Sequence, residues 1–365
     1  MKATTLFLTL SLFYFLGCKE NRRKPPEDQR SDIQADTLFS SDYKHNLVHV
    51  NGTYFFIDQQ VNLIKKLGKW EQAELFDYRR LGFARVKKKG KNYLLDTLGN
   101  SYRVAFTVED LSPEIIALYL SGQELDEFPT EILAYPKLEI LLINWGHRLE
   151  IPSEISQLTQ LKFLTLRSCR IEILPESFGQ LQNLQVLDLS SNELSTLPES
   201  FGQLQNLQVL DLSRNGLRTL PESFGQLQNL QRLYLRGNLS GNDLRTLPES
   251  FGQLQNLQRL DLSGNDLRTL PESFVQLQNL QYLYLEFNDL STLPESFGQL
   301  QNLLRLNLDN NKLTTLPESF GQLQNLQELS LRCYWMTIEE KKRINRLLPN
   351  CYVYPLFQIK KPPFF

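Results

Sequence analysis

The residues of this chain that are best suited to covalent catalysis, metal binding or disulfide formation are four cysteines and three histidines. They are Cys18, Cys169, Cys333, Cys351, His45, His49 and His147. The chain contains no Cys-x-x-Cys and no His-Glu-x-x-His motif, no Gly-x-Ser-x-Gly motif and no Gly-rich loop that could hold a phosphate. We therefore expect no catalytic residues, no metal and no cofactor, and we predict that the protein is not an enzyme.

The overall charge also narrows the classes of partner. The 365 residues carry a formal net charge of −2, with 41% hydrophobic and 22% charged residues, which is ordinary for a folded soluble protein. Nothing in this balance indicates nucleic acid or an acidic membrane surface as a partner. Four cysteines are also too few for a disulfide scaffold.

The strongest signal in the sequence is a 23-residue period. It is marked by the nine prolines Pro129, Pro152, Pro175, Pro198, Pro221, Pro248, Pro271, Pro294 and Pro317, which are evenly spaced except for a longer step from Pro221 to Pro248. In the clearest unit, Leu187 and Leu189 alternate as in a strand, so both face one side. Phe201, Leu204 and Leu207 then follow at three-residue spacing, which suits a helical or 3-10 turn. A regular repeat of this length predicts a solenoid.

The unit that runs from Leu184 to Leu207 resembles the leucine-rich-repeat family, in its 23-residue type. The resemblance implies an α/β repeat, that is, a curved solenoid with a parallel β-sheet on its concave face, over residues 109–332. The asparagine at positions 192, 215, 265, 288 and 311 is expected to bond backbone groups of the turn. Cys169 occupies the same slot, where the family accepts cysteine, so its role should be structural.

Residues 333–365 read as a cap that closes the array, because the period fails after Leu331. Residues 338–348 predict an amphipathic helix, and residues 352–354 predict a last strand. Cys333 and Cys351 both lie in this segment, and the sequence leaves open whether they form a disulfide.

The single longer step between the prolines indicates an insertion. Residues 239–242 repeat as residues 262–265, so we assign the four extra residues to 239–242. The insertion should bulge at the rim of the solenoid, beside the strand that starts near Arg232. Whether it has a function is open, since unequal duplication also explains it.

The strand positions between the buried leucines are free to contact a partner on the concave face. In the later units they combine aromatic rings with guanidinium groups, which are the side chains that dominate protein–protein hot spots. The candidate ligand-binding residues are Arg232, Tyr234, Arg236, Arg259, Tyr282, Tyr284, Phe287 and Arg305. A simpler interpretation is that exposed strands favour tyrosine and that the charges keep the surface soluble.

The N-terminus reads as a targeting segment. An apolar stretch of 14 residues, from Ala3 to Leu16, is too short to span a membrane. Its last two residues begin the segment Phe15-Leu16-Gly17-Cys18, which resembles the lipobox of bacterial lipoproteins. The resemblance implies a signal peptide over residues 1–18, lipidation of Cys18 and a flexible linker over residues 19–38. The match departs from the usual pattern at Phe15 and Leu16. An ordinary secretory signal with an incidental cysteine remains the alternative.

Between residues 39 and 108 the chain reads as a small β-rich segment. Two stretches align at a 38-residue spacing, and each predicts a hairpin with a glycine turn, at Gly52 and at Gly90. The second stretch, from Gly82 to Gly99, resembles bacterial WG-type repeats. Hairpins are marginal alone, so we expect them to pack on the N-terminal end of the solenoid.

These features predict a membrane-tethered, extracytoplasmic binding module, which is monomeric and lipid-anchored at a bacterial outer membrane or cell surface. Its expected partner is another protein, with a surface glycan as the alternative. The repeat type also resembles Ras-associated leucine-rich-repeat proteins, which implies an intracellular signalling scaffold as a second hypothesis. A passive structural or adhesive surface protein is the third. The sequence does not identify the ligand or the biological process.

Overall fold

The computed structural model describes residues 37–39, 45–60, 62–75, 83–123, 125–237 and 242–354. They form two compact units, one of residues up to Ala105 with Glu114–Ala117, the other of Phe106–Pro113 and the chain from Leu118 onward. None of the helices in the described ranges is long and apolar enough to cross a bilayer. The predicted signal segment, including Cys18, lies outside the described residues.

The first unit contains two small antiparallel sheets. One is built from β1 (Thr37–Phe39), β2 (Asn46–Val50), β3 (Thr53–Ile57) and β4 (Lys69–Trp70), and the other from β5 (Gln72–Ala73), β6 (Ala84–Lys88), β7 (Lys91–Leu95) and β8 (Ser101–Ala105). Both sheets contribute to one core, in which Phe56 and Leu95 are fully buried. The indole Nε1 of Trp70 donates to the carbonyl oxygen of Leu67 at 2.6 Å.

The two hairpins predicted from the 38-residue spacing are both present, and they turn in the same way. Asn51-Gly52 connects β2 to β3 and Lys89-Gly90 connects β6 to β7, with φ values of 47° and 75° in the first turn and 49° and 71° in the second. Two successive residues with positive φ are the mark of a type I′ turn, whose twist matches that of the flanking strands.

An aspartate closes the polar turn after each hairpin with equivalent bonds. Asp58 Oδ1 accepts a hydrogen bond from the amide of Asn62 at 2.8 Å, and Asp96 Oδ1 accepts one from the amide of Asn100 at 2.8 Å. In each case the asparagine side chain donates back to the second carboxylate oxygen. The sequence similarity therefore corresponds to a structural duplication.

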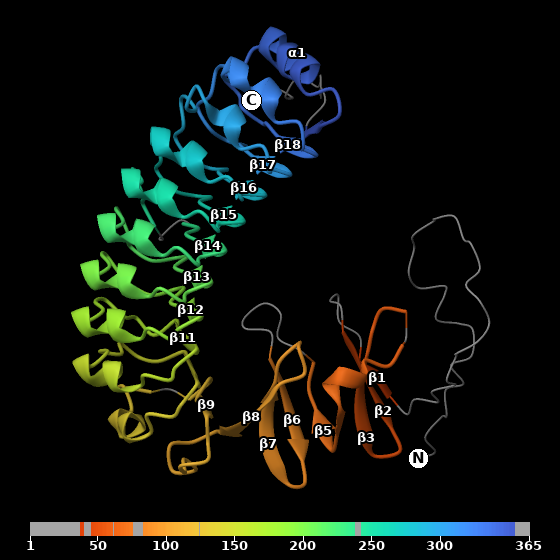
Figure 1. Cartoon of the computed structure of the whole chain (residues 1–365), viewed down its shortest axis with the longest axis vertical. Coiled ribbons are helices and arrows are strands. Elements are labelled where there is room, and N and C mark those ends of the chain that lie inside the picture. The colour runs from red at the N-terminus through yellow and green to blue at the C-terminus, as the bar shows by residue number, and fades with distance from the viewer. Residues whose placement is uncertain are drawn as a thin grey trace, which may run out of the picture. The chain divides into compact units, whose positions relative to one another are not determined.

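The second unit is a solenoid in which a coil consists of one short strand and one 3-10 turn. The strands are β9 (Ala117–Tyr119), β10 (Ile140–Asn144), β11 (Phe163–Arg167), β12 (Val186–Asp188), β13 (Val209–Asp211), β14 (Arg232–Tyr234), β15 (Arg259–Asp261), β16 (Tyr282–Tyr284), β17 (Arg305–Asn307) and β18 (Glu328–Ser330). The turns are η3 (Thr130–Ala134), η4 (Ser153–Gln157), η5 (Glu176–Gln180), η6 (Glu199–Gln203), η7 (Glu222–Gln226), η8 (Glu249–Gln253), η9 (Glu272–Gln276), η10 (Phe297–Gln299) and η11 (Glu318–Gln322). In Figure 1 the strands line the inner, concave side of the curved stack, and the turns line its outer side.

The register of the parallel sheet follows the sequence period. Leu187 pairs with Leu210, its equivalent in the next unit, and Leu210 pairs with Leu233. The step from Leu233 in β14 to Leu260 in β15 is the longer one, yet the equivalent leucines still pair. The curved solenoid predicted from the repeat period is thus confirmed, with its strands in one parallel ladder.

A column of phenylalanines forms the outer part of the core. It consists of Phe178, Phe201, Phe224, Phe251, Phe274, Phe297 and Phe320, all fully buried. From Phe178 to Phe274 the neighbouring rings are stacked, with centroids 6.2–6.3 Å apart and planes within 2° of parallel. Identical side chains at identical positions can stack in this way only if the coils repeat closely.

The glycine that follows the phenylalanine allows the coils to approach. A Cβ at Gly225 would lie 2.2 Å from the carbonyl oxygen of Ser250 in the next coil, a clash that would force the coils apart. Val275 occupies this slot in one coil, and the coil that packs on it differs from the others. Its turn, η10, begins at Phe297, whereas the other turns of this type begin at the glutamate after the proline.

Buried asparagines join the coils on the side where each strand ends. Asn215 Nδ2 donates to the carbonyl oxygens of Leu189 and Leu212, both at 3.0 Å, and its Oδ1 accepts from the amide of Leu194 at 3.1 Å. Equivalent bonds are made at 192, 265, 288 and 311. This confirms the turn-bonding role predicted for the asparagines.

The structure corrects the placement of the insertion. Asn242 takes the asparagine slot, because it is buried and donates to Leu212 O and Leu235 O while it accepts from Leu217 N. The four extra residues are therefore 238–241, outside the described residues, and not 239–242. Asn238 and Asn242 have the same side chain, so the sequence could not distinguish which of them continues the ladder.

The C-terminal cap was predicted correctly in its elements. Helix α1 (Ile338–Leu347) begins after Thr337, whose side chain accepts a hydrogen bond from the amide of Glu340 at 3.2 Å. Strand β19 (Tyr352–Tyr354) then pairs in parallel with β18. Cys333 and Cys351 are both free thiols, which answers the question of the disulfide that the sequence left open.

Cys169 is also free and lies fully buried in the asparagine slot. Burial raises the pKa of its thiol to about 11. A thiol in this state is a poor nucleophile, in agreement with the structural role expected for it.

Candidate ligand-binding surface

The parallel register arranges the candidate residues in rows across the concave face. Along one row, Arg232 pairs with Arg259, Arg259 with Tyr282, and Tyr282 with Arg305. Residues in adjacent strands stand about 4.8 Å apart. Side chains that lie one repeat apart in the sequence are therefore direct neighbours on this face.

Arg259 lies at the centre of this arrangement. Its guanidinium carbon is 4.8 Å from the centroid of the Tyr284 ring, 5.6 Å from that of Tyr282 and 5.9 Å from that of Tyr234. The side chain is half-buried, and its Nε is buried without a hydrogen-bond partner. Rings from two neighbouring strands thus hold one cation in place by cation–π contact.

The remaining candidate ligand-binding residues lie around Arg259. Arg232 is exposed beside it, while Arg305 forms an ion pair with Glu328 at 3.0 Å. Arg236 and Phe287 follow the ends of β14 and β16, and Phe287 is 61% exposed with its backbone at a φ of 57°. We call these eight residues, with Arg259 at their centre, the Arg259 surface.

One acidic group lies close to the Arg259 surface. Burial raises the pKa of the Glu286 carboxyl, and the nearby carboxylates of Asp261 and Asp309 add to this effect, while Arg236 opposes it. Its Oε2 is buried without a hydrogen-bond partner. The surface therefore combines guanidinium groups with a carboxyl group that burial makes easier to protonate.

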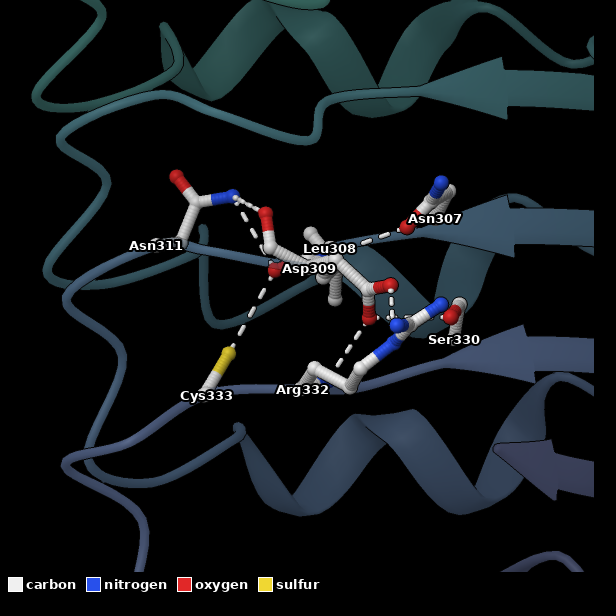
Figure 2. Close-up of polar contacts among 7 residues, drawn as sticks. All are labelled: Asn307, Leu308, Asp309, Asn311, Ser330, Arg332 and Cys333. Carbon is white, nitrogen blue, oxygen red and sulfur yellow. Dashed lines mark hydrogen bonds and ion pairs between the residues drawn. The ribbon is translucent and has the colours of Figure 1, made fainter. Parts of the chain in front are cut away.

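The buried carboxylate of Asp309 forms an ion pair and hydrogen bonds with residues of the next coil (Figure 2). Its Oδ2 is 2.9 Å from Arg332 Nε, and its Oδ1 accepts from the Arg332 amide at 2.6 Å and from Ser330 Oγ at 2.8 Å. Figure 2 also shows Cys333 directed at the backbone of the previous coil, where its Sγ is 3.3 Å from Leu308 O. These contacts tie the last coils together beside the binding surface.

Sequence reasoning missed two tyrosines that extend this face. The register places Tyr352 beside Glu328 and Tyr354 beside Ser330, and the two rings lie 4.2 Å apart, edge to face. Both are about half exposed. The signal was present, since residues 352–354 were predicted to form the last strand, but the two rings were not included among the candidate residues.

A pair of aspartates on the earlier strands was also passed over. Asp188 and Asp211 are direct neighbours in the β12–β13 register. Burial raises the pKa of Asp211 to about 6, with a further contribution from the charge of Asp188, while hydrogen bonds from Ser213 and the charge of Arg167 oppose the shift. The repeat spacing showed that the two are adjacent, but it could not show how deeply they are buried.

We expect Asp211→Asn to stabilise the fold at neutral pH. Because the pKa in the folded state is higher than the ordinary value of 3.8, the ionised group opposes folding once the pH rises through about 6, and the penalty disappears below the unfolded pKa. A shift of about two units corresponds to roughly 1–3 kcal/mol. Urea unfolding at pH 7.5 should show this gain, and the same comparison at pH 4 should show little. An equal difference at both pH values would contradict the assignment.

Within the described ranges, no three His, Cys, Asp or Glu side chains are grouped so that they could hold a metal ion. The proposed lipidation site, Cys18, lies outside those ranges. The candidate residues on strands β14 to β17 lie side by side in the parallel sheet.

Comparison with known proteins agrees with this architecture. Residues 159–204, 197–244, 238–290 and 291–332 match the family described as leucine rich repeat. No curated protein sequence matches the chain. A leucine-rich-repeat protein of Leptospira interrogans is 30% identical over 66% of this chain and 90% of that chain, with a TM-score of 0.33.

Two receptor structures are similar in fold. The leucine-rich-repeat ectodomain of the plant membrane receptor kinase GASSHO1/SCHENGEN3 from Arabidopsis thaliana, in complex with CASPARIAN STRIP INTEGRITY FACTOR 2, is 29% identical over 74% of this chain, with a TM-score of 0.53. Drosophila Toll, in its complex with Spatzle, is 28% identical over 61% of this chain, with a TM-score of 0.50. The chain spans only 32% and 33% of those two proteins. The repeat matches and the coiled architecture together show that this chain belongs to the leucine-rich-repeat family.

Proposed function

We propose that this chain is a non-enzymatic binding protein that holds a protein partner on its concave face, at the Arg259 surface. The observation that carries the proposal is the position of Arg259 among three tyrosine rings, at 4.8–5.9 Å. A guanidinium fixed in this way loses little conformational freedom when a partner binds, which lowers the cost of association. Tyrosine and arginine are also the residue types that contribute most at hot spots.

The similar structures support a protein as the partner. The two similar receptors were each solved in a complex, one with CASPARIAN STRIP INTEGRITY FACTOR 2 and the other with Spatzle. This chain shares the repeat architecture with them but covers about a third of their length. The identity of its own partner is therefore a matter for experiment.

The proposal includes a lipid tether at Cys18 that holds the protein at a bacterial outer membrane or cell surface. It is based on the resemblance of residues 15–18 to a lipobox. Mass spectrometry of the mature protein from its native cell tests this part. A diacylated N-terminal Cys18 is expected, and an intact Met1 would contradict both the tether and the extracytoplasmic location.

The docking site can be tested by affinity capture followed by mutation. Proteins that the immobilised chain retains would be identified, and their affinity measured for the unaltered chain, for Arg259→Ala and for Arg268→Ala. We expect the first variant to weaken binding at least tenfold, about 1.4 kcal/mol or more, because the tyrosine rings lose the cation that orders them. Arg268 is exposed and follows the strand by several residues, so its variant should bind within twofold of the unaltered chain.

Two results would count against this site. If both variants bind as tightly as the unaltered chain, the partner docks elsewhere. If both are weakened equally, binding depends on overall positive charge and not on the Arg259 surface.

A further inference from the structure

The concave face contains a second polar cluster, on strands β11 to β13, apart from the Arg259 surface. Its members are Asp188, Asp211, Thr165 and Arg167. The β-ladder pairs Thr165 with Asp188 and Asp188 with Asp211, so the three side chains stand in one row on the same face. This cluster shares no residue with the Arg259 surface, although Asp211 pairs with Tyr234 of that surface in the ladder.

Each aspartate is held in place by its own backbone. Asp188 Oδ1 accepts from the amide of Ser190 at 2.9 Å, and Asp211 Oδ1 accepts from the amide of Ser213 at 2.9 Å. Neighbouring strands lie about 4.8 Å apart, so the two carboxylates face a gap of similar width. Two anions fixed at this separation create a strong demand for positive charge between them.

In the described ranges, the chain supplies a positive charge to the buried Asp309 but not to Asp188 and Asp211. Asp309 has Arg332 Nε at 2.9 Å, whereas no lysine or arginine of the described residues lies within ion-pair distance of Asp188 or Asp211. Arg167 acts on Asp211 only through its field, and its own Nε is buried without a hydrogen-bond partner. The acidic pair therefore lacks a counterion of its own within the part of the chain that the structure describes.

A second observation concerns the polar atoms beside the aspartates. Thr165 is only 1% exposed, and its Oγ1 is buried without a hydrogen-bond partner beside Asp188. Asn144, which pairs with Arg167 in the ladder, is 3% exposed, and its Oδ1 also lacks a partner. Buried polar atoms of this kind are almost always satisfied in native proteins, and that of Thr165 lies next to Asp188 in the ladder.

We infer that Asp188, Asp211 and Thr165 form a binding site for a primary ammonium group. An ammonium is a compact cation with three N–H donors, so it can bridge two carboxylates across a gap of about 4.8 Å, and the Thr165 hydroxyl lies in the same row, next to Asp188. A divalent metal fits less well, because the described residues offer no third carboxylate, thiolate or imidazole there. The positive charge of Arg167 would also repel a divalent ion more strongly.

The ammonium could be a lysine side chain or a free chain N-terminus, and simple peptides distinguish the two sources. The probes are Nα-acetylated Gly-Lys-Gly amide, Gly-Gly-Gly amide with a free N-terminus, and acetylated Gly-Gly-Gly amide, which has no ammonium. The amides of Ser190 and Ser213 are natural reporters, because they donate to the two carboxylates. Their NMR signals in the ¹⁵N-labelled full chain, produced without lipidation, would be followed at pH 7.5 during each titration.

We expect saturable shifts with one or both ammonium peptides and none with the acetylated glycine peptide. Asp188→Asn and Asp211→Asn should each weaken the apparent affinity at least tenfold. Asn can replace Asp without loss of the backbone bond, since Asn307 Oδ1 accepts from the Asp309 amide at 3.1 Å in the same way. Asp261→Asn is the matched control, because Asp261 lies in the same row and accepts from the Ser263 amide at 3.0 Å, and it should leave the titration unchanged.

Thr165→Val provides a variant that keeps the shape of the side chain and removes only the hydroxyl, and it should weaken binding severalfold.

Lowering the pH to 5 should also weaken binding, because Asp211 then takes up a proton. The charged and titratable groups beside it are Asp188, which pairs with it from β12, Arg167, whose charge acts on it, and Tyr234, which pairs with it from β14.

The inference is overturned if neither ammonium peptide shifts the reporter amides, if all three peptides shift them equally, or if binding persists in both Asp188→Asn and Asp211→Asn. Partner docking at the Arg259 surface is measured with other variants. A failure of one proposal therefore leaves the other standing.

Discussion

Phe224→Ala should lower the free energy of unfolding by about 3–5 kcal/mol, the range for removal of a buried phenylalanine. The Phe224 ring is fully buried, with the rings of Phe201 and Phe251 at 6.3 and 6.2 Å. Close packing on both sides leaves no side chain free to fill the cavity. In a repeat protein this loss falls on the interfaces between coils, so we also expect the unfolding transition to broaden as the two halves of the array become less tightly coupled.

Guanidinium unfolding followed by circular dichroism measures both effects. Ile173→Ala is the control, because it also removes an apolar side chain from the solenoid but one that is 72% exposed, and it should change the stability by no more than about 0.5 kcal/mol. Equal losses in the two variants, or a loss below about 1 kcal/mol at Phe224, would mean that the phenylalanine column does not hold the coils together.

The repeat period was sufficient to predict most of the fold. Leu187 and Leu189 are buried and flank an outward strand position, as their alternation indicated. Because the same pattern recurs in each unit, each strand residue can be expected to pair with the residue one repeat further along the chain. The consequence of Val275 did not follow, because it depends on how closely Gly225 and its equivalents approach the next coil, and that distance is a property of the backbone.

The binding surface could be predicted only in part for a similar reason. The register was enough to place Arg259 beside Tyr282, but the closest ring, that of Tyr284 at 4.8 Å, belongs to another row, and contact across rows depends on side-chain direction. Whether the carboxylates of Asp188 and Asp211 need a positively charged partner also depends on how deeply they are buried, which a pattern of residue types does not reveal.

The insertion gives the sharpest test of the coil register. Asn242→Ala should lower the free energy of unfolding by about 3–5 kcal/mol, because it leaves the amide of Leu217 and the carbonyl oxygens of Leu212 and Leu235 without their partner. A buried polar group that loses its hydrogen bond costs about 1–3 kcal/mol, and relaxation of the rim recovers part of the sum. Urea unfolding of the variant and the unaltered chain gives the difference directly.

Asn238→Ala is the matched control, because it makes the same change four residues earlier. Asn238 follows the Leu-x-Leu pattern of its strand at the same spacing as the asparagines of the other units. If Asn242 fills the ladder slot, the Asn238 variant should stay within about 0.5 kcal/mol of the unaltered chain. The opposite result, a large loss at Asn238 and little at Asn242, would restore residues 239–242 as the insertion. It would also require the backbone after Leu235 to follow a different path, since only one of the two side chains can bond Leu212 and Leu217 of the preceding coil at once.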